Sequence, residues 1–146
     1  SSALSDFLEN YPEPLYIGFG SMINGRPKEI GHIILKVCGE LEIPVVINKS
    51  WGGIEIEEPL PSWAFVVDNV PFDWLFKEVR AVVHHGGSGT THSALRFNQR
   101  QLIIPHIADQ FLWNRLVHEA GIGPLGFPIK ELDESKLKKA LVKLLS

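Results

Sequence analysis

The sequence predicts a three-layer α/β domain built on a mainly parallel sheet. Short apolar runs rich in Val and Ile alternate along the chain with segments whose apolar residues have helical spacing. These runs are continuous rather than alternating, which is typical of strands that helices bury on both faces. Polar or glycine-rich loops follow three of the runs. In an open parallel sheet such loops meet at the carboxyl ends of the strands, where ligands bind.

The first half of the chain carries two expected strands and one clear helix. The run LYIGF (residues 15–19) predicts the first strand, and the loop GSMINGRP follows it. A helix over residues 27–40 begins with proline, which suits a first turn, and has one apolar face made by Ile30, Ile33, Ile34 and Val37. The second strand is VVIN (residues 45–48), and residues 49–62 form a connection rich in Gly, Pro and Glu.

The second half continues the alternation and completes a domain of Rossmann type. Its expected elements are a strand over residues 64–69, a short helix over 71–79, a strand over 81–85, a helix over 88–98, a strand over 101–105, a helix over 109–121 that Gly121 ends, and a final helix whose stripe is Leu137, Ala140, Leu141 and Leu144. The loops GFGSM, HHGGSGTT and PHIADQ then fall at the carboxyl ends of strands. Their convergence at one edge is the main physical indication of a site.

Size and composition indicate one soluble domain over residues 1–146. With 146 residues, of which 45% are hydrophobic, the chain can bury a core of its own. A net charge of -3 without a basic face argues against nucleic acid. Cys38 is the single cysteine, which excludes an internal disulfide and fits a reducing, cytoplasmic compartment. We find no signal peptide at the start of this sequence and no apolar run of the roughly 20 residues that span a membrane.

The segment HHGGSGTTHSAL (residues 84–95) has the composition of an anion-binding turn. Glycines let the backbone approach a phosphate closely, and a helix N-terminus offers unpaired N–H groups and partial positive charge. Hydroxyls and a histidine add further donors, from Ser88, Thr90, Thr91 and His85. The pattern is neither a Walker loop nor the dinucleotide fingerprint. The alternative is a tight structural turn in which Ser88 only caps the helix.

The residues around this segment resemble the nucleotide-sugar site of the UDP-glycosyltransferases. The stretches VPFDWLFKEVRAVVHHGGSGTTHSAL and IPHIADQFLWNRLVHEAGIGP are most similar to sterol glucosyltransferases and to related antibiotic glycosyltransferases. The resemblance covers nearly the whole chain, from PEPLYIGFGSM to GIGPLGFPIKEL. It implies the GT-B fold, in which two Rossmann-like domains enclose the active site, and it identifies this chain with the C-terminal, donor-binding half.

The resemblance also implies roles for individual residues. The donor diphosphate is expected at Gly20, Ser21, His85, Gly87, Ser88, Gly89 and Thr90. The uracil and ribose are expected at Val67, Asp68 and Val70. Asp109 and Gln110 are expected to bind the sugar hydroxyls, which suits a carboxylate and an amide. Without the resemblance, Asp109 reads as the N-cap of a helix.

The sequence departs from the family at four positions. Plant members have an aromatic residue at the position of Val67 and a glutamine at that of Val70, so base stacking and a ribose contact are in doubt there. The family usually has Gly and Pro where Asn98 and Arg100 stand, from which we expect altered loop geometry and little loss of donor binding.

The other conspicuous aromatic and histidine residues have plainer interpretations. We interpret Trp74, Leu75 and Phe76 as core, and Trp113 as a packing residue. Trp51 could flank the donor. The remaining histidines lack the spacing of metal ligands, and no metal is predicted.

The expected reaction is inverting transfer from a UDP-sugar, with glucose as the family default, to a hydroxyl of a sterol, lipid or natural product. The UDP-sugar is a co-substrate, and no cofactor is expected. The resemblance assigns the general base and the acceptor pocket to an N-terminal domain that this sequence does not contain, so we expect a fragment that is inactive alone and contacts a membrane only through that domain. A UDP-N-acetylglucosamine-dependent subunit with a partner chain, a non-catalytic nucleotide-sugar-binding module and a thymidine-linked donor remain alternatives.

Overall fold

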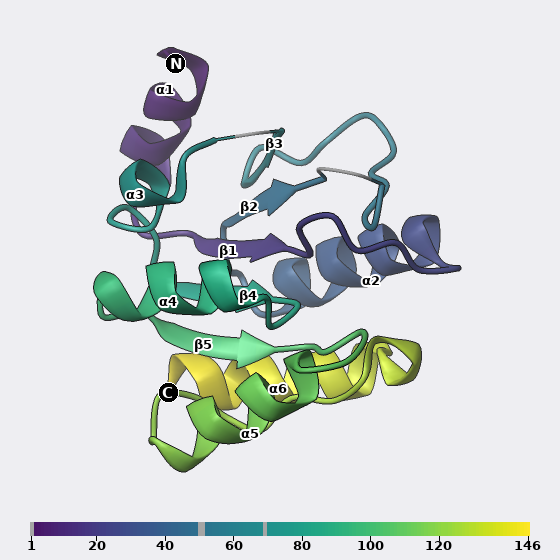
Figure 1. The fold of residues 1–146 in the computed structure, drawn as a ribbon. Helices are drawn as coiled ribbons and strands as arrows, with labels where there is room; N and C mark the ends of the chain where they lie inside the picture. Colours follow the sequence, from purple (N-terminus) through teal and green to yellow (C-terminus); the bar gives the residue numbers. More distant parts are fainter. Residues whose placement is uncertain (1, 50–51, 69) are drawn as a thin grey trace.

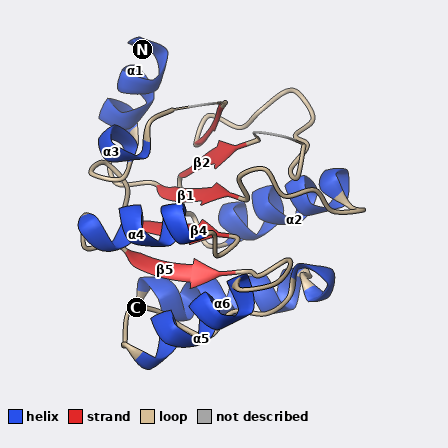
Figure 2. Cartoon of the chain, viewed as in Figure 1, coloured by secondary structure: helices blue, strands red, loops and turns tan. Residues whose placement is uncertain are grey.

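Five parallel strands form the centre of the protein (Figure 1). The computed structural model describes residues 2–49, 52–68 and 70–146. The strands run in the order β3-β2-β1-β4-β5, and every neighbouring pair is parallel, so all labelled arrowheads point the same way in Figure 2. Their bounds are β1 Leu15–Gly18, β2 Val45–Asn48, β3 Ala64–Val67, β4 Ala81–His84 and β5 Arg100–Ile103. The predicted α/β class with a parallel sheet is confirmed.

Six α-helices and one short 3-10 helix surround the sheet in the described part of the chain. They are α1 Ser2–Asn10, α2 Pro27–Glu40, α3 Phe72–Leu75, α4 Ser88–Arg96, α5 Gln110–Glu119, α6 Glu134–Leu145 and the 3-10 helix Ile129–Glu131. Helix α1 was not predicted, although Leu4, Phe7 and Leu8 have helical spacing. The predicted helix over residues 71–79 is too long, because α3 ends at Leu75. The expected strand over 81–85 ends at His84, which leaves His85 in the turn that follows.

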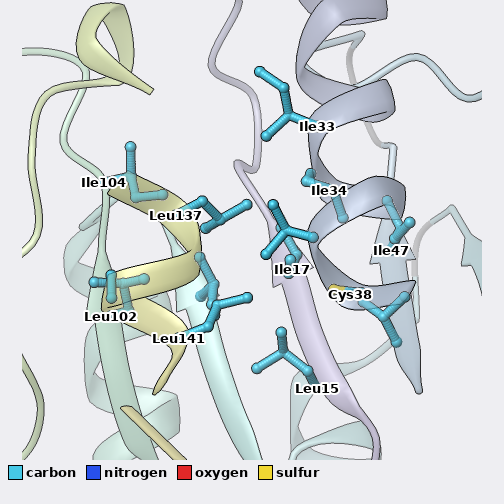
Figure 3. Close-up of a cluster of buried hydrophobic side chains, with 14 of the residues drawn as sticks. Leu15, Ile17, Ile33, Ile34, Cys38, Ile47, Leu102, Ile104, Leu137 and Leu141 are labelled. Carbon is cyan, nitrogen blue, oxygen red and sulfur yellow. The ribbon is translucent and has the colours of Figure 1, made fainter. Parts of the chain in front are cut away.

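The two faces of the sheet carry separate apolar clusters, which makes the domain three layers thick. On one face α2 and α6 pack together over β1, β4 and β5, and Figure 3 shows Ile34, Leu137 and Leu141 meeting Ile17 and its neighbours. On the other face α1, α3 and α4 cover a second cluster around a fully buried aromatic pair, Tyr16 and Phe76. Since both faces are covered, the strands need the continuous apolar runs seen in the sequence.

Helices α4 and α5 end in the same type of cap, made by two different residues. After α5, Gly121 has φ +74 and donates its N–H to the His118 carbonyl. After α4, Asn98 has φ +57 and donates in the same way to the Leu95 carbonyl. Both are Schellman caps, whose left-handed position favours Gly and accepts Asn. Asn98 therefore adopts the left-handed conformation that a glycine would adopt at this position.

Arg100, the other departure in that loop, reaches the end of a distant helix. Its guanidinium Nε donates to the Leu144 carbonyl at 2.8 Å, near the C-terminus of α6. Last-turn carbonyls have no partner within their own helix, and a cation is favourable there. Arginine thus gives β5 a link to α6 that a proline could not make.

A glycine-containing segment covers the outer edge of β5. Residues 121–126 lie so close to this strand that a Cβ at Gly123 would overlap the Gln101 carbonyl, and one at Gly126 would overlap the Ile103 carbonyl. Asn114 of α5 fixes the segment by accepting from the Gly126 N–H at 2.9 Å and donating to its carbonyl at 3.2 Å. The edge strand is therefore shielded by a segment that only glycine lets approach.

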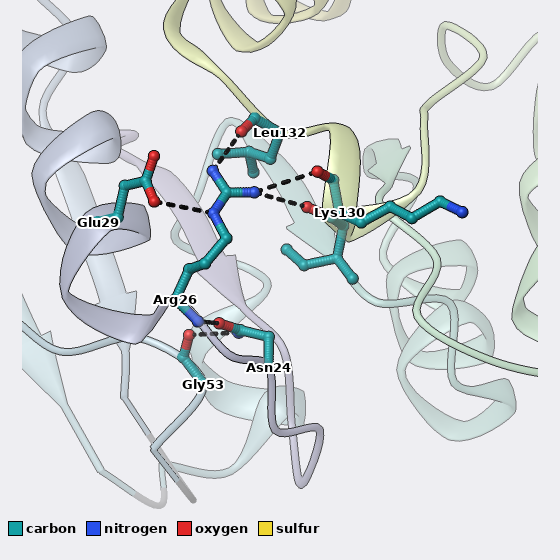
Figure 4. A network of polar contacts seen from close by, with 7 residues as sticks. Asn24, Arg26, Glu29, Gly53, Lys130 and Leu132 are labelled. Atoms are coloured by element: carbon teal, nitrogen blue, oxygen red, sulfur yellow. Dashed lines mark hydrogen bonds and ion pairs between the residues drawn. The ribbon is translucent and has the colours of Figure 1, made fainter.

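Arg26 fixes the β1–α2 loop (residues 19–26) at its far end. Its guanidinium donates to the Leu132 carbonyl at 2.7 Å and to the Lys130 carbonyl at 3.2 Å, and it pairs with Glu29 at 2.9 Å (Figure 4). Asn24 accepts from the Arg26 N–H and donates to the Gly53 carbonyl. The loop that follows β1 is thus anchored to two distant segments. Among the described residues, no helix is long and apolar enough to cross a bilayer.

Candidate functional site

The strand order places a switch point between β1 and β4. These two strands are neighbours, but β1 leads to α2 on one face and β4 leads to α4 on the other. The two connections therefore leave the sheet toward opposite faces, and open α/β sheets bind ligands in the crevice where this happens. The β1–α2 loop and the β4–α4 turn (residues 85–87) approach each other there, because a Cβ at Gly20 would lie 2.8 Å from Cε1 of His85.

His84 shapes the β4–α4 turn from inside the protein. Its side chain is fully buried, and Nδ1 accepts from the Gly86 N–H at 3.0 Å. Nε2 must then carry the proton, and it donates to Oε1 of Gln101 at 2.7 Å. Burial lowers the pKa of His84 to about 4, so the ring is neutral at neutral pH. With its N–H turned inward, Gly86 adopts φ +96 and directs the chain toward α4.

Helix α4 presents a free N-terminus at this edge. Gly87 is its N-cap and no side chain caps it, so the interpretation of Ser88 as a cap is wrong. The first helical bond runs from the Thr91 N–H to the Gly87 carbonyl, which leaves the N–H groups of residues 88–90 ahead of it. We predicted that the Thr91 hydroxyl donates to a ligand. This is wrong, because the hydroxyl is buried and donates to the same carbonyl at 2.8 Å.

His85 stands beside this N-terminus with little room around its ring. A Cβ at Gly87 would lie 2.5 Å from Nε2 of His85, so both Gly87 and Gly20 are needed for the ring position. The residue is 9% exposed, and its burial lowers the pKa of the imidazole. Of the other residues predicted to surround a diphosphate, Ser21, Ser88 and Gly89 are exposed, and Thr90 is buried at the start of α4.

The β5–α5 loop (residues 104–109) holds its shape through the side chain of Gln110. The Oε1 atom of Gln110 accepts from the N–H groups of His106 at 2.7 Å and Ile107 at 3.0 Å, and Nε2 donates to Sδ of Met22. Sequence analysis offered only a sugar contact for Gln110 and did not foresee this brace. Asp109, in contrast, is exposed and its carboxylate makes no capping hydrogen bond, so it is available to a ligand.

His106 is the site residue that sequence analysis did not select. Nδ1 lies 2.9 Å from the Ile104 carbonyl, to which it donates, and the ring packs 5.0 Å from Phe19 and 6.5 Å from His85. Burial, its main cause, together with the neighbouring His85 lowers the pKa of His106 to about 4. The signal that could have found it is its place in the loop PHIADQ, at the carboxyl end of a strand.

A cavity of about 640 Å³ lies at the end of edge strand β3. It is lined by the three residues predicted to bind uracil and ribose, Val67, Asp68 and Val70, and also by Leu4, Phe65 and Trp74. Trp74 is 37% exposed, so its interpretation as core is wrong, whereas Leu75 and Phe76 are fully buried as predicted. Trp113 packs against His92 with ring centroids 5.2 Å apart. Trp51 lies outside the described residues. Within residues 2–49, 52–68 and 70–146, no group of acidic, His or Cys side chains could hold a metal ion.

A sequence model of the erythromycin biosynthesis protein CIII-like C-terminal domain matches residues 32–146. The chain belongs to this family. The chain is also 40% identical to a sterol 3-beta-glucosyltransferase of Arabidopsis thaliana over 139 residues, which are 94% of the chain and 22% of that protein. It is 37% identical over 134 residues to the sterol 3-beta-glucosyltransferase of Kluyveromyces lactis, covering 87% of the chain and 11% of the relative.

Solved glycosyltransferase structures share the fold of this chain. The glycotransferase of kitacinnamycin superposes with a TM-score of 0.77 at 21% identity, over 92% of this chain and 35% of that one. UGT89C1 of Arabidopsis thaliana gives 0.77 at 19% identity, over 99% of this chain and 40% of the other. The chain thus has the Rossmann-like fold of one part of these enzymes. It spans about a fifth or less of the length of the curated relatives named above.

Proposed function

We propose that this domain binds the UDP-sugar donor, UDP-glucose in the first place, of a glycosyltransferase that acts on a hydroxyl of a sterol, lipid or natural product. The observation that carries the proposal is the uncapped N-terminus of α4 beside His85 at the β1/β4 switch point. The names of the sterol 3-beta-glucosyltransferase relatives support the choice of sugar and acceptor class.

The chemistry of this site suits a departing nucleoside diphosphate. When the acceptor oxygen attacks the anomeric carbon with inversion, the bond to the diphosphate breaks and negative charge grows on its oxygens. Three helix N–H groups (residues 88–90) and the imidazole of His85 are donors already in place for that charge, so they favour the transition state over the bound sugar nucleotide.

The rest of the reaction is assigned to chain outside residues 1–146. A general base for the acceptor hydroxyl, the acceptor pocket and any contact with a membrane would belong to an acceptor domain, by the family resemblance. Cys38 takes no part in this chemistry, since it is buried and its burial raises the thiol pKa to about 12, which makes it unreactive.

Calorimetric titration with UDP tests the diphosphate site, and Gly89→Ala is the sharpest variant. A Cβ at Gly89 would meet no protein atom within 4 Å, so the protein itself has no reason to reject it. Alanine also favours a helix over glycine by about 0.5–1 kcal/mol. If a diphosphate approaches the start of α4, Gly89→Ala weakens UDP binding tenfold or more in a domain that is no less stable. Unchanged affinity would contradict the assignment.

Asp109→Asn tests the sugar contact separately. Because the carboxylate is exposed and makes no capping bond, the substitution should leave stability and UDP affinity unchanged. Any preference for UDP-glucose over UDP, or over UDP-N-acetylglucosamine, should shrink. A preference for UDP-N-acetylglucosamine in the unmodified domain would instead favour the alternative donor.

A further inference from the structure

Two buried nitrogen atoms on neighbouring histidines make no hydrogen bond to the protein. They are Nδ1 of His85 and Nε2 of His106, and the two rings lie 6.5 Å apart at 87°. Buried polar atoms are nearly always paired, so two unpaired ones on adjacent rings need an explanation. Both rings also stand at the switch point, next to the proposed donor site.

The surroundings of the other nitrogen on each ring determine whether the unpaired nitrogen can donate or accept a hydrogen bond. Nε2 of His85 is on the side of Gly87, the N-cap of α4, so it is the atom that a bound diphosphate would meet. Nδ1 of His106 donates to the Ile104 carbonyl, which leaves Nε2 of His106 as a hydrogen-bond acceptor when this ring is neutral. A neutral His85 has one N–H and cannot serve both a diphosphate and His106 as donor. An imidazolium has two.

We propose that His106 is a positioning residue that supports the protonated form of His85 when the donor binds. The proposal rests on the proposed function. On binding, His85 takes one proton from solvent, donates through Nε2 to the diphosphate, and donates through Nδ1, by way of one water molecule, to Nε2 of His106. Donor binding is then coupled to the uptake of one proton.

Without a bound ligand, no carboxylate among the described residues forms an ion pair that would stabilise protonated His85. The ring of His85 lies near Gly20 of the β1–α2 loop, Gly87 at the start of α4, and the rings of His84 and His106. No ion pair to either ring is found in the described part of the chain, and Asp109 points to an exposed position. Burial lowers the pKa of both histidines, so both are neutral until the negative diphosphate is bound.

The test is titration of the 146-residue domain with UDP-glucose in buffers of different ionisation enthalpy. UDP-glucose is the better probe because its diphosphate is esterified at both ends and does not itself titrate near neutral pH. Near pH 7 the calorimetric heats should report the uptake of about one proton per ligand bound. Affinity should rise up to about tenfold for each unit by which the pH falls, until free His85 is itself protonated.

Two substitutions at position 106 separate the acceptor from mere packing. His106→Asn keeps a donor for the Ile104 carbonyl but removes the acceptor at the Nε2 position, whereas His106→Gln can place an oxygen there. We expect Asn to reduce proton uptake by at least half and to weaken UDP-glucose binding several-fold at pH 6.5, with little change at pH 8.5. Gln should restore part of both. His32→Gln, on the exposed face of α2, is the matched control and should change neither.

The outcomes distinguish this inference from the proposed function. If UDP and UDP-glucose bind without proton uptake, or if His106→Asn weakens binding equally at both pH values, His106 only packs in the loop and the inference is wrong while the donor site stands. If neither ligand binds at millimolar concentrations, the proposed function fails and the inference fails with it.

Discussion

The β4–α4 turn and the β5–α5 loop are neighbours that turn the chain in the same way with different residues. β4 pairs with β5, and a Cβ at Gly86 would lie 3.1 Å from the Gln110 carbonyl oxygen, so the two connections touch. Each has one left-handed residue, Gly86 at φ +96 or Ala108 at φ +52. In each, a buried side chain at the end of the adjoining element accepts from N–H groups of the connection: His84 of β4 for the turn, and Gln110 of α5 for the loop.

The two connections differ in what maintains the left-handed backbone conformation. In the β4–α4 turn glycine adopts the left-handed backbone conformation without strain. It also has no side chain that would obstruct the close approach of a ligand. In the β5–α5 loop an alanine takes the left-handed conformation against its own preference, and Gln110 holds the loop in place. The β4–α4 turn thus depends on the absence of a side chain at Gly86, whereas the β5–α5 loop depends on the hydrogen bonds of the Gln110 side chain.

Acid should destabilise both connections, and this is the largest effect we expect. His84 borders the turn and His106 lies in the loop, and the pKa of each falls from 6.5 to about 4 in the folded chain. The unfolded chain then binds more protons between these values, so stability is lost as pH falls from about 6.5 toward 4. At pH 5 the loss is about 2 kcal/mol for the fully buried His84 and smaller for His106, because solvent screens the partly exposed ring. Urea unfolding at pH 7, 6 and 5 measures it, and His106→Phe should remove the smaller part of the dependence. A slope unchanged by that variant would contradict the pKa of His106.

Gly86→Ala should break the β4–α4 turn. A Cβ there would lie 2.8 Å from Ile103 Cγ2 and would force a side chain onto φ +96. Strain and overlap together should lower the free energy of unfolding by about 3 kcal/mol. Equilibrium unfolding measures this, with Gly89→Ala as control, since its Cβ meets open space. A loss below 1 kcal/mol would mean that the turn relaxes easily.

Gln110→Met should weaken the β5–α5 loop by leaving the N–H groups of His106 and Ile107 without an acceptor. We expect a loss of about 2 kcal/mol, and a smaller one for Gln110→Glu, which keeps the acceptor. If stability is unchanged but the preference for UDP-glucose disappears, Gln110 acts on the sugar and not on the loop.

Ala108→Gly should strengthen the loop slightly, in contrast to the opposite exchange at Gly86. The left-handed conformation of alanine costs about 1 kcal/mol, and removing the Cβ relieves this strain. Glycine also increases the conformational entropy of the unfolded chain, which offsets part of the gain. The net change should be a gain below about 1 kcal/mol. Thermal unfolding measures it, and a loss of stability would show that the alanine is not strained.

The same contrast explains what the sequence could and could not predict. The strands were recognisable because burial on both faces requires continuous apolar runs, and the β4–α4 turn because glycine marks its unusual backbone. The brace of Gln110 depends on Met22, and that of His84 depends on Gln101. Such partners become neighbours only through strand order and register, which local patterns do not specify.

Other mispredictions also come from contacts between distant parts of the chain. Ala108 carries no mark of a left-handed residue, and His106 gains its environment from Phe19 and His85. Helix α1 was overlooked although its spacing was visible, because its apolar residues need the partners supplied by Phe65 and Phe76 in the second cluster. Sequence patterns thus identified the loops of the site, and the structure identified what holds them.

The position of α6 has a consequence for synthesis on the ribosome. Leu137, Leu141 and Leu144 complete the apolar cluster that α2 begins, so one face of the sheet has its full cover only after residues 134–145 have left the exit tunnel. Until then the strands can pair, but Leu102 and Ile104 lack that helix over them. Nascent chains paused before this point should therefore bind chaperones, and the domain should not resist protease before α6 has emerged.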